Sequence, residues 1–203
     1  MYRMLPNDRN AIVLTFDDGP VPGQTPRILE ILQAKQARAT FYVLGELAEA
    51  HPDLVRDIRD AGHEVGNHTQ THPHFRDADP QLIDREMRQA QDVLTRILAS
   101  HPSTFRPPYF DYNEHVARTA TDLGLPVIGN SIFPGDWVEN ATPDELRETA
   151  SSDTKAGDIL LFHDRSAAMV EGLPLILDDL IERGLSFATA ADLVQTAMQE
   201  PAP

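Results

Sequence analysis

Two adjacent carboxylates stand at the end of a short apolar run in this sequence. Asp17 and Asp18 follow the run 12–16 and directly precede a Gly-Pro pair. A β-branched apolar run that is closed by Gly-Pro predicts a buried strand leading into a tight turn. Because side chains alternate along an extended backbone, the two acids cannot do the same work. One carboxylate can ligate a metal ion while the other stays free as a base.

Histidines further along the chain could complete such a metal site. His68 and His72 are spaced i and i+4, and His163 stands alone after another apolar run. On a helix this spacing would place His68 and His72 on one face, but Pro73 disfavours helical dihedrals at the residue before it. We therefore expect the pair on a turn that follows a strand. Imidazole and carboxylate groups are ordinary ligands of zinc and related divalent cations.

Each of these features also has an ordinary structural explanation. An Asp-Asp-Gly-Pro sequence is often only a polar turn, and an isolated pair of histidines is more often not a ligand pair. Arg106 begins a proline-rich segment that is typical of a rigid turn, and Trp137 could simply belong to the core. We interpret the five remaining histidines as structural or surface residues: His51, His63, His74, His101 and His115.

The bulk composition narrows the possible partners. The chain has 203 residues, with 32 acidic against 17 basic side chains, a formal charge of −15 and 41% apolar residues. These values predict a single domain over residues 1–203. The negative charge argues against nucleic acid or an anionic membrane surface as a partner, and a neutral substrate suits it better. Because the chain has no cysteine, disulfides and thiolate metal ligands are excluded.

The sequence says little about location or assembly. Residues 1–8 lack the apolar region of a signal peptide, and no later stretch is long enough to cross a membrane. We therefore expect a soluble chain and a monomer. If the chain is a mature protein or an excised domain, we expect it outside the cell or in the cell envelope.

Short apolar runs alternate with helical patterns along the chain. We expect strands close to residues 12–16, 39–44, 64–66, 104–106, 125–130, 158–162 and 185–188. Helices are expected to begin near residues 25, 52, 80, 113, 143 and 169, followed by a short terminal helix. An alternation of about seven strands with helices predicts an α/β fold built on a parallel sheet or barrel.

The candidate residues fall at equivalent places in this pattern. Polar clusters lie at or just after the C-terminal ends of predicted strands: Asp17–Asp18, His68–His72, Arg106–Tyr109, Asp136–Trp137 and His163–Asp164. In parallel α/β folds, catalytic residues collect on this face of the sheet. We therefore expect the clusters to meet at one site.

In their order, these clusters resemble the five motifs of the polysaccharide deacetylase family, the NodB-like group of carbohydrate esterase family 4. The similarity extends over about residues 12–190. It implies a distorted (β/α) barrel with a divalent metal in a groove at its C-terminal face. Zinc is the expected metal, with cobalt or nickel as substitutes. Phe110 and Phe133 depart from the family pattern and should alter the groove wall rather than the chemistry.

The resemblance implies roles for the acids and for the histidine pair. Asp18, His68 and His72 would hold the metal ion. Asp17 would be the general base that takes a proton from the attacking water. Arg106 would orient Asp17 and keep it ionised, because a nearby opposite charge favours the charged form.

The later motifs would complete the catalytic groups. His163 would protonate the departing sugar amine or alcohol, and Trp137 would pack beside it. Asp136 would hold Arg106, raise the pKa of His163, or do both; the sequence leaves these alternatives open. The substrate side of the site would consist of the backbone N–H of Tyr109, which would stabilise the oxyanion, and the rings of Tyr109, Phe110 and Tyr112, on which a sugar could stack.

We therefore predict a metal-dependent carbohydrate deacetylase. Its substrates would be the N-acetyl groups of chitin oligosaccharides or peptidoglycan, or the O-acetyl groups of acetylxylan. One alternative is a related barrel amidohydrolase acting on a small cyclic amide, against which the aromatic groove argues. Another is a catalytically silent carbohydrate-binding barrel, which has no need to retain Asp17 and His163 beside the metal ligands.

Overall fold

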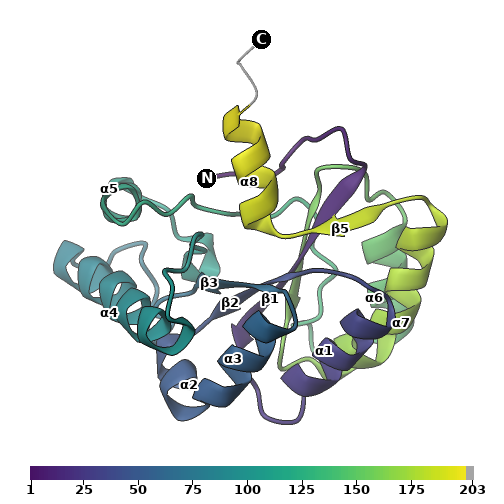
Figure 1. Ribbon diagram of the computed structural model, residues 1–203, viewed down its shortest axis with the longest axis horizontal. Helices are drawn as coiled ribbons and strands as arrows, with labels where there is room; N and C mark the ends of the chain where they lie inside the picture. The colour runs from purple at the N-terminus through teal and green to yellow at the C-terminus, as the bar shows by residue number, and fades with distance from the viewer. Residues whose placement is uncertain (200–203) are drawn as a thin grey trace.

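A parallel sheet forms the centre of the computed structural model, which describes residues 1–199 (Figure 1). Its order is β3-β2-β1-β4, and β5 pairs with the first residues of β1. Every strand pair in this sheet is parallel. The strands are β1 (Ala11–Gly19), β2 (Thr40–Val43), β3 (Glu64–Asn67), β4 (Ile159–His163) and β5 (Ser186–Ala188).

Isolated bridges continue the sheet towards a closed barrel. Beyond β3, Asn67 pairs with Phe105, and Phe105 pairs in turn with Val127, each in the parallel sense. From the other edge, Ile132 pairs with Leu160 of β4. The fold is therefore an α/β barrel of distorted form, and the predicted fold class is confirmed.

The predicted number of about seven strands is too high for the part of the chain that the structure describes. The expected strands at 104–106 and 125–130 are present only as single bridges around Phe105 and Val127. Pro107 and Pro126 flank these bridges and have no N–H to donate, which prevents a longer ladder at either place.

Helices surround the sheet (Figure 1). They are α1 (Thr25–Ala34), α2 (Gly45–Ala50), α3 (Pro52–Asp60), α4 (Pro80–Leu98), α5 (Glu114–Asp122), α6 (Pro143–Ser151), α7 (Ala167–Glu182) and α8 (Ala190–Gln199), with a 3-10 turn η1 (Pro108–Phe110). The sequence pattern did not predict α2, because a helix of six residues is too short to show a periodic apolar face. None of the helices in residues 1–199 is long and apolar enough to span a membrane.

Side-chain caps account for several of the helix starts. Asp79 accepts a hydrogen bond from the backbone of α4, and Asn113 and Ser166 do the same for α5 and α7. Thr142 and Glu145 form a reciprocal capping box at the start of α6. Such caps satisfy N–H groups that have no partner within the helix, so they fix where each helix begins.

The residues of β1 alternate between two environments. Ile12, Leu14 and Phe16 belong to the main core, which the helices cover, whereas Val13 belongs to a second cluster on the other face. Asp17 follows Phe16 by one residue and therefore lies on the face of Val13, inside the barrel. The alternation of a single strand thus brings a carboxylate into the interior.

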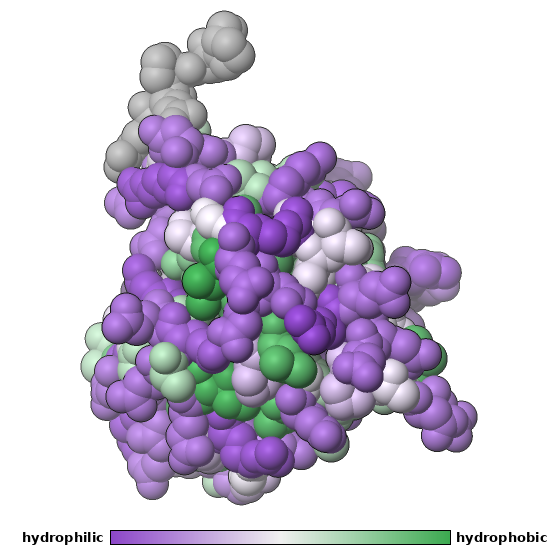
Figure 2. Space-filling model, turned by 90° about the vertical axis from the view of Figure 1, so that its right-hand side faces the viewer, coloured by the Kyte–Doolittle hydropathy of each residue, from purple (hydrophilic) through white to green (hydrophobic). Residues whose placement is uncertain are grey.

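The outer surface is mostly polar. The face at the right of Figure 1 is largely hydrophilic, and the apolar residues visible on it form separate patches (Figure 2). This agrees with the excess of acidic over basic side chains, 32 against 17.

Two leucines of α7 provide a matched test of the main core. Leu173 is fully buried, whereas Leu175 is 46% exposed. We expect Leu173→Ala to lower the free energy of unfolding by about 2–5 kcal/mol, because it leaves a cavity. Leu175→Ala should change it by less than about 0.5 kcal/mol. Chemical denaturation of both variants measures the difference, and equal losses would contradict this packing.

Candidate active site

The predicted clusters meet in one cavity at the C-terminal ends of the strands. The cavity has a volume of about 850 Å³, and each of the five clusters contributes to its lining. The acids come from the end of β1, the histidine pair from the loop after β3, and His163 from the end of β4. The expectation that these clusters share one site therefore agrees with the geometry.

A break in β1 separates the two adjacent acids. Asp17 stays in the strand, but Asp18 has a positive φ of 68°, and the register with β2 shifts between Asp17 and Gly19. The side chain of Asp18 consequently turns away from that of Asp17 and towards the histidines. Such a bulge re-aims a side chain at the end of a strand.

Gly19 is required at this break because Asp164 lies directly against it. A Cβ atom at Gly19 would be 2.3 Å from Oδ2 of Asp164, so no other residue fits. Asp164 is fully buried, accepts a hydrogen bond from the hydroxyl of Thr25 and donates its own N–H to the carbonyl of Asp17 at 3.0 Å. Burial raises the pKa of Asp164 to about 7.

Asp18, His68 and His72 form a group that could hold a metal ion. One ligand atom from each lies within 4.8 Å of the other two. Oδ1 of Asp18 is 3.5 Å from Nε2 of His68 and 3.2 Å from Nε2 of His72. This oxygen is buried and has no hydrogen-bond partner. Two nitrogens and one carboxylate oxygen are the donor set of a mononuclear zinc site, so the residues fit a divalent cation.

The protonation states of these groups favour metal binding. Nδ1 of His68 lies 2.7 Å from the carbonyl oxygen of Arg106, to which it must donate, so Nε2 carries the free lone pair. Burial, helped by the charge of His68, lowers the pKa of His72 to about 4, so this ring is neutral at pH 7. Burial alone would raise the pKa of Asp18, but its contact with His68 and the charges of nearby histidines lower it overall.

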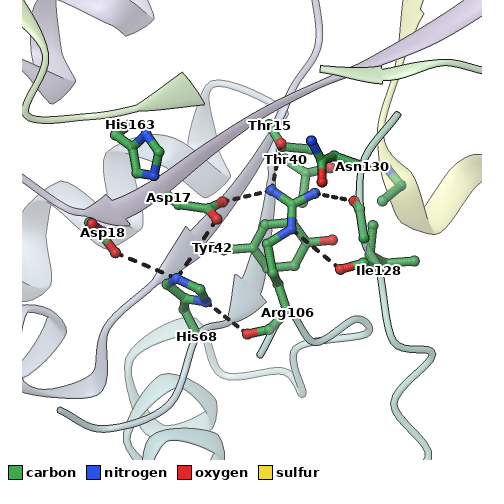
Figure 3. Close-up of polar contacts among 12 residues, drawn as sticks. Thr15, Asp17, Asp18, Thr40, Tyr42, His68, Arg106, Ile128, Asn130 and His163 are labelled. Carbon is green, nitrogen blue, oxygen red and sulfur yellow. Dashed lines mark hydrogen bonds and ion pairs between the residues drawn. The ribbon is translucent and has the colours of Figure 1, made fainter. Parts of the chain in front are cut away.

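Asp17 is paired with a fully buried arginine (Figure 3). Nη1 of Arg106 donates to Oδ1 of Asp17 at 2.8 Å and to the hydroxyl of Thr15 at 2.6 Å. The other nitrogens donate to the carbonyls of Ile128 and Gly129 at 3.3 and 2.6 Å. A buried charge is tolerated only with such partners, and here they hold Asp17 in a single orientation.

Asp136 contacts His163, and this geometry bears on the alternatives that the sequence left open: holding Arg106, raising the pKa of His163, or both. Oδ1 of Asp136 accepts from Nδ1 of His163 at 2.9 Å, and Oδ2 accepts from its backbone N–H at 2.7 Å. Burial acts to lower the pKa of His163, but the hydrogen bond to Asp136 and the charge of Asp17 outweigh it and raise this pKa. Arg106 instead pairs with Asp17.

Aromatic side chains form one wall of the cavity. Phe110 meets Phe133 edge to face at 6.0 Å between ring centroids, and Phe133 meets Trp137 in the same way at 6.2 Å. Trp137 lies against His163 at 5.5 Å, as the resemblance implied. Phe133, which we expected only to alter the wall, is one of its faces.

Two other aromatic positions differ in how they lie relative to the cavity. Tyr112 is 44% exposed and is not among the residues that line the cavity, and its role as a stacking face stays a prediction. Tyr109 does line it, and its ring stacks on His74 at 3.6 Å. His74 was interpreted as a structural or surface residue. Its position two residues after His72 was the only sequence signal that placed it near the site.

Two charged residues at the cavity were missed altogether. Glu46 comes from α2, which the sequence did not predict, and Arg165 follows the cluster His163–Asp164 by one residue. Nη2 of Arg165 is 3.7 Å from Oδ2 of Asp18. The cavity therefore carries a cation on its rim in addition to its acids.

The fold and the site together define a (β/α) barrel with a candidate metal centre of two histidines and one aspartate. Residues 5–128 match the family model described as polysaccharide deacetylase. The chain belongs to the polysaccharide deacetylase family, as its motifs indicated.

Relatives with assigned activities extend this result. A peptidoglycan-N-acetylglucosamine deacetylase of Bacillus cereus is 31% identical over 196 residues, which are 94% of this chain and 91% of the relative. A chitooligosaccharide deacetylase of Rhizobium leguminosarum bv. trifolii is 36% identical over 158 residues, which are 78% of this chain and 73% of the relative.

Solved structures of the family have the same fold. A family 4 carbohydrate esterase from Streptomyces lividans, in complex with acetate, aligns with a TM-score of 0.83 and 32% identity, covering 88% of this chain and 92% of that one. A family 4 pseudoenzyme from Bacillus anthracis aligns with a TM-score of 0.89 and 26% identity, covering 96% and 68%. The fold alone therefore does not establish that a member is active.

Substitution of each neighbouring acid by its amide tests the division of roles. Asp18→Asn should weaken zinc binding, because it replaces the charged oxygen that faces both histidines. Asp17→Asn should leave zinc affinity near that of the original protein, because Oδ1 of Asp17 is held by Arg106 and its Oδ2 approaches only one of the two histidines, His68, at 3.7 Å. Calorimetric zinc titration of the two folded variants measures this. Loss of affinity in Asp17→Asn alone would require the two roles to be exchanged.

Proposed function

We propose that this protein is a metal-dependent hydrolase that removes acetyl groups from a glycan containing N-acetylglucosamine. The observation that carries the proposal is the arrangement around Asp18. Its buried, unpartnered Oδ1 faces two histidine nitrogens. A second carboxylate, Asp17, stands beside it: its Oδ1 is held by Arg106, and its Oδ2 lies 3.7 Å from Nε2 of His68. A site with free positions and a separate base is typical of catalytic rather than structural metal centres.

The residues around the centre would divide the chemistry as follows. A divalent cation held by Asp18, His68 and His72 would lower the pKa of a water towards about 7 and polarise the acetyl carbonyl. Asp17 takes the proton of the attacking water, and Arg106 holds its carboxyl group in one orientation. Arg106 is fully buried and is not part of the cavity lining, so it acts through Asp17.

The remaining groups would act on the acetyl oxygen and the leaving group. The backbone N–H of Tyr109 donates to the oxyanion, and loss of one such donor typically costs about 3 kcal/mol. His163 donates its proton to the departing nitrogen or oxygen, and Asp136 keeps that proton available by raising the pKa of the ring. Proton removal and proton donation are therefore assigned to different side chains.

A glycan suits the cavity better than a small cyclic amide. The aromatic wall of Phe110, Phe133 and Trp137 offers apolar faces on which a pyranose can pack. The relatives described above act on peptidoglycan and on chitooligosaccharides. Acetylxylan remains a third candidate, because the same groups can cleave an acetate ester.

The alternative function is a catalytically silent barrel. The structurally similar pseudoenzyme from Bacillus anthracis is the reason to consider it. Sugar binding alone would require neither a carboxyl group of Asp17 held by a buried arginine nor the His163–Asp136 pair. Both arrangements are present in full here. They support an active enzyme.

Further expectations stay predictions. These are a single domain over residues 1–203, of which 200–203 lie outside the described residues, a monomeric state, and a location outside the cell or in the cell envelope. The acidic surface continues to argue against nucleic acid as a partner.

The proposed activity is tested by acetate release from chitopentaose, peptidoglycan and acetylxylan, each with and without a chelator. We expect release from at least one of the N-acetylated substrates, loss of that release on chelation, and recovery on addition of zinc or cobalt. Asp17→Asn, assayed in parallel as an inactive control, removes the base. Activity that persists in the chelated protein would argue against a metal centre, and no release from any substrate would favour the silent barrel.

The pH dependence of turnover tests the role of His163. An acid must carry its proton, so turnover should fall as pH rises through the pKa of His163. Asp136→Asn removes a charge that raises this pKa, and the alkaline limb of the pH profile should therefore move to lower pH. Asp158→Asn is the control, because Asp158 is equally buried but bonds Ser131 and Lys155 instead. If the alkaline limb of the pH profile lies at the same pH in the original protein and in both variants, the assignment of His163 as the acid is contradicted.

A further inference from the structure

The loop that carries both candidate histidine ligands has an unusual backbone conformation. Between His68 and His72 it contains two residues with positive φ, 73° at Thr69 and 63° at His72. Residues other than glycine adopt this region at a cost, so the surrounding structure must hold them there. We call residues 68–72 the histidine loop.

Two N–H groups of the histidine loop point to one buried carboxylate. Oε2 of Glu86 accepts from the N–H of Gln70 at 3.0 Å and from that of Thr71 at 2.8 Å. Oε1 of the same residue accepts from the hydroxyl of Thr71 at 3.0 Å. Glu86 comes from the middle of α4 and is only 6% exposed. Both of its buried carboxyl oxygens therefore have hydrogen-bond donors from the loop.

The opposite edge of the histidine loop is held by α2. The N–H groups of Gly45 and Glu46, at the start of that helix, donate to the carbonyls of Thr69 and Gln70, each at 3.0 Å. The loop backbone therefore lies between a helix N-terminus that binds its carbonyls and a carboxylate that binds its N–H groups. These two sets of hydrogen bonds fix the direction in which the side chains of His68 and His72 extend from the backbone.

We propose that Glu86 is a positioning residue for the metal centre. Its carboxyl group bonds the backbone and the Thr71 hydroxyl of the histidine loop and is not part of the cavity lining, so it acts by holding the backbone between His68 and His72. The inference rests on the proposed metal centre and adds a residue outside the five family motifs. Tight metal binding requires the ligand geometry to be kept within fractions of an ångström. Hydrogen bonds that hold the loop backbone therefore strengthen metal binding.

A carboxylate suits this position better than an amide. All three contacts are donors aimed at Glu86, two at one oxygen and one at the other. Glutamine has nearly the same shape but would direct an NH₂ group at one of these donor sets. Charge-assisted hydrogen bonds are also stronger than neutral ones, and this loss would loosen the loop.

The test is metal affinity rather than turnover. Zinc titration and the visible absorption spectrum of the cobalt-loaded protein are measured for the original protein and for Glu86→Gln. We expect Glu86→Gln to bind zinc about 10–100-fold more weakly, the range typical when a group that orients metal ligands is replaced. The cobalt spectrum should change as well, because the two imidazoles would no longer be held in one geometry.

Glu64→Gln provides the matched control. Glu64 also accepts several hydrogen bonds, from Thr40, Thr104 and the backbone of Ala191, but it lies at the start of β3, at the opposite end of the strand from the histidine loop. We expect this variant to lose stability without losing zinc affinity. Equal loss of affinity in both variants would mean that general destabilisation, not positioning, explains the effect.

The outcomes separate this inference from the proposed function. If the original protein binds zinc and Glu86→Gln binds it equally tightly, the role of Glu86 is wrong while the metal centre stands. If the original protein binds no zinc, the metal centre itself is wrong, and the role of Glu86 with it. Should Glu86→Gln fail to fold, Thr71→Val removes only the hydroxyl contact; weaker zinc binding by this variant supports the inference, and unchanged binding overturns it.

Discussion

The buried guanidinium of Arg106 is the interaction on which the barrel and its site both depend. On this side of the barrel the strands are reduced to single bridges, and the side chain of Arg106 reaches from there across the interior to β1. It donates to the carbonyls of Ile128 and Gly129 on one side and to Thr15 and Asp17 of β1 on the other. Because a guanidinium presents several donors in a rigid plane, one side chain can set all of these distances at once.

The different surroundings of the two neighbouring acids follow from a local change of backbone. Asp17 keeps the alternation of β1 and enters the interior, where Arg106 meets it, whereas Asp18 lies at the bulge and turns to the histidines. Only glycine fits at the next position, since Asp164 fills the space that a side chain would need. A sequence of three residues, Asp-Asp-Gly, is thus a structural requirement as well as a chemical one.

Much of this could be predicted from the sequence because the signals are local. The strand before Asp17, the non-helical turn at His72 and the meeting of the clusters depend on apolar runs and on proline positions that lie close by in the chain. The place of Phe133 in the cavity wall, and that of Tyr112 outside the cavity lining, could not be predicted, because loop paths decide which ring reaches the cavity. Only one feature of the sequence indicates the role of Glu86. It is an acidic residue on the apolar face of α4, between Ile83 and Met87.

The buried acids around the site differ in the partners of their carboxyl oxygens. This difference distinguishes one oxygen, Oδ1 of Asp18, from the others. Asp17 has an arginine, and Glu86 has the N–H groups of the histidine loop. Among the described residues, two carboxylates retain a buried oxygen without a hydrogen bond, Asp164 and Asp18. The raised pKa of Asp164 allows it to be neutral near pH 7, so its burial requires no counter-charge. The pKa of Asp18 is lowered instead, although burial acts to raise it, because His68 and the charges of nearby histidines favour its charged form. Its unpartnered Oδ1 therefore lies charged between two imidazole nitrogens, an environment that a bound cation would complete.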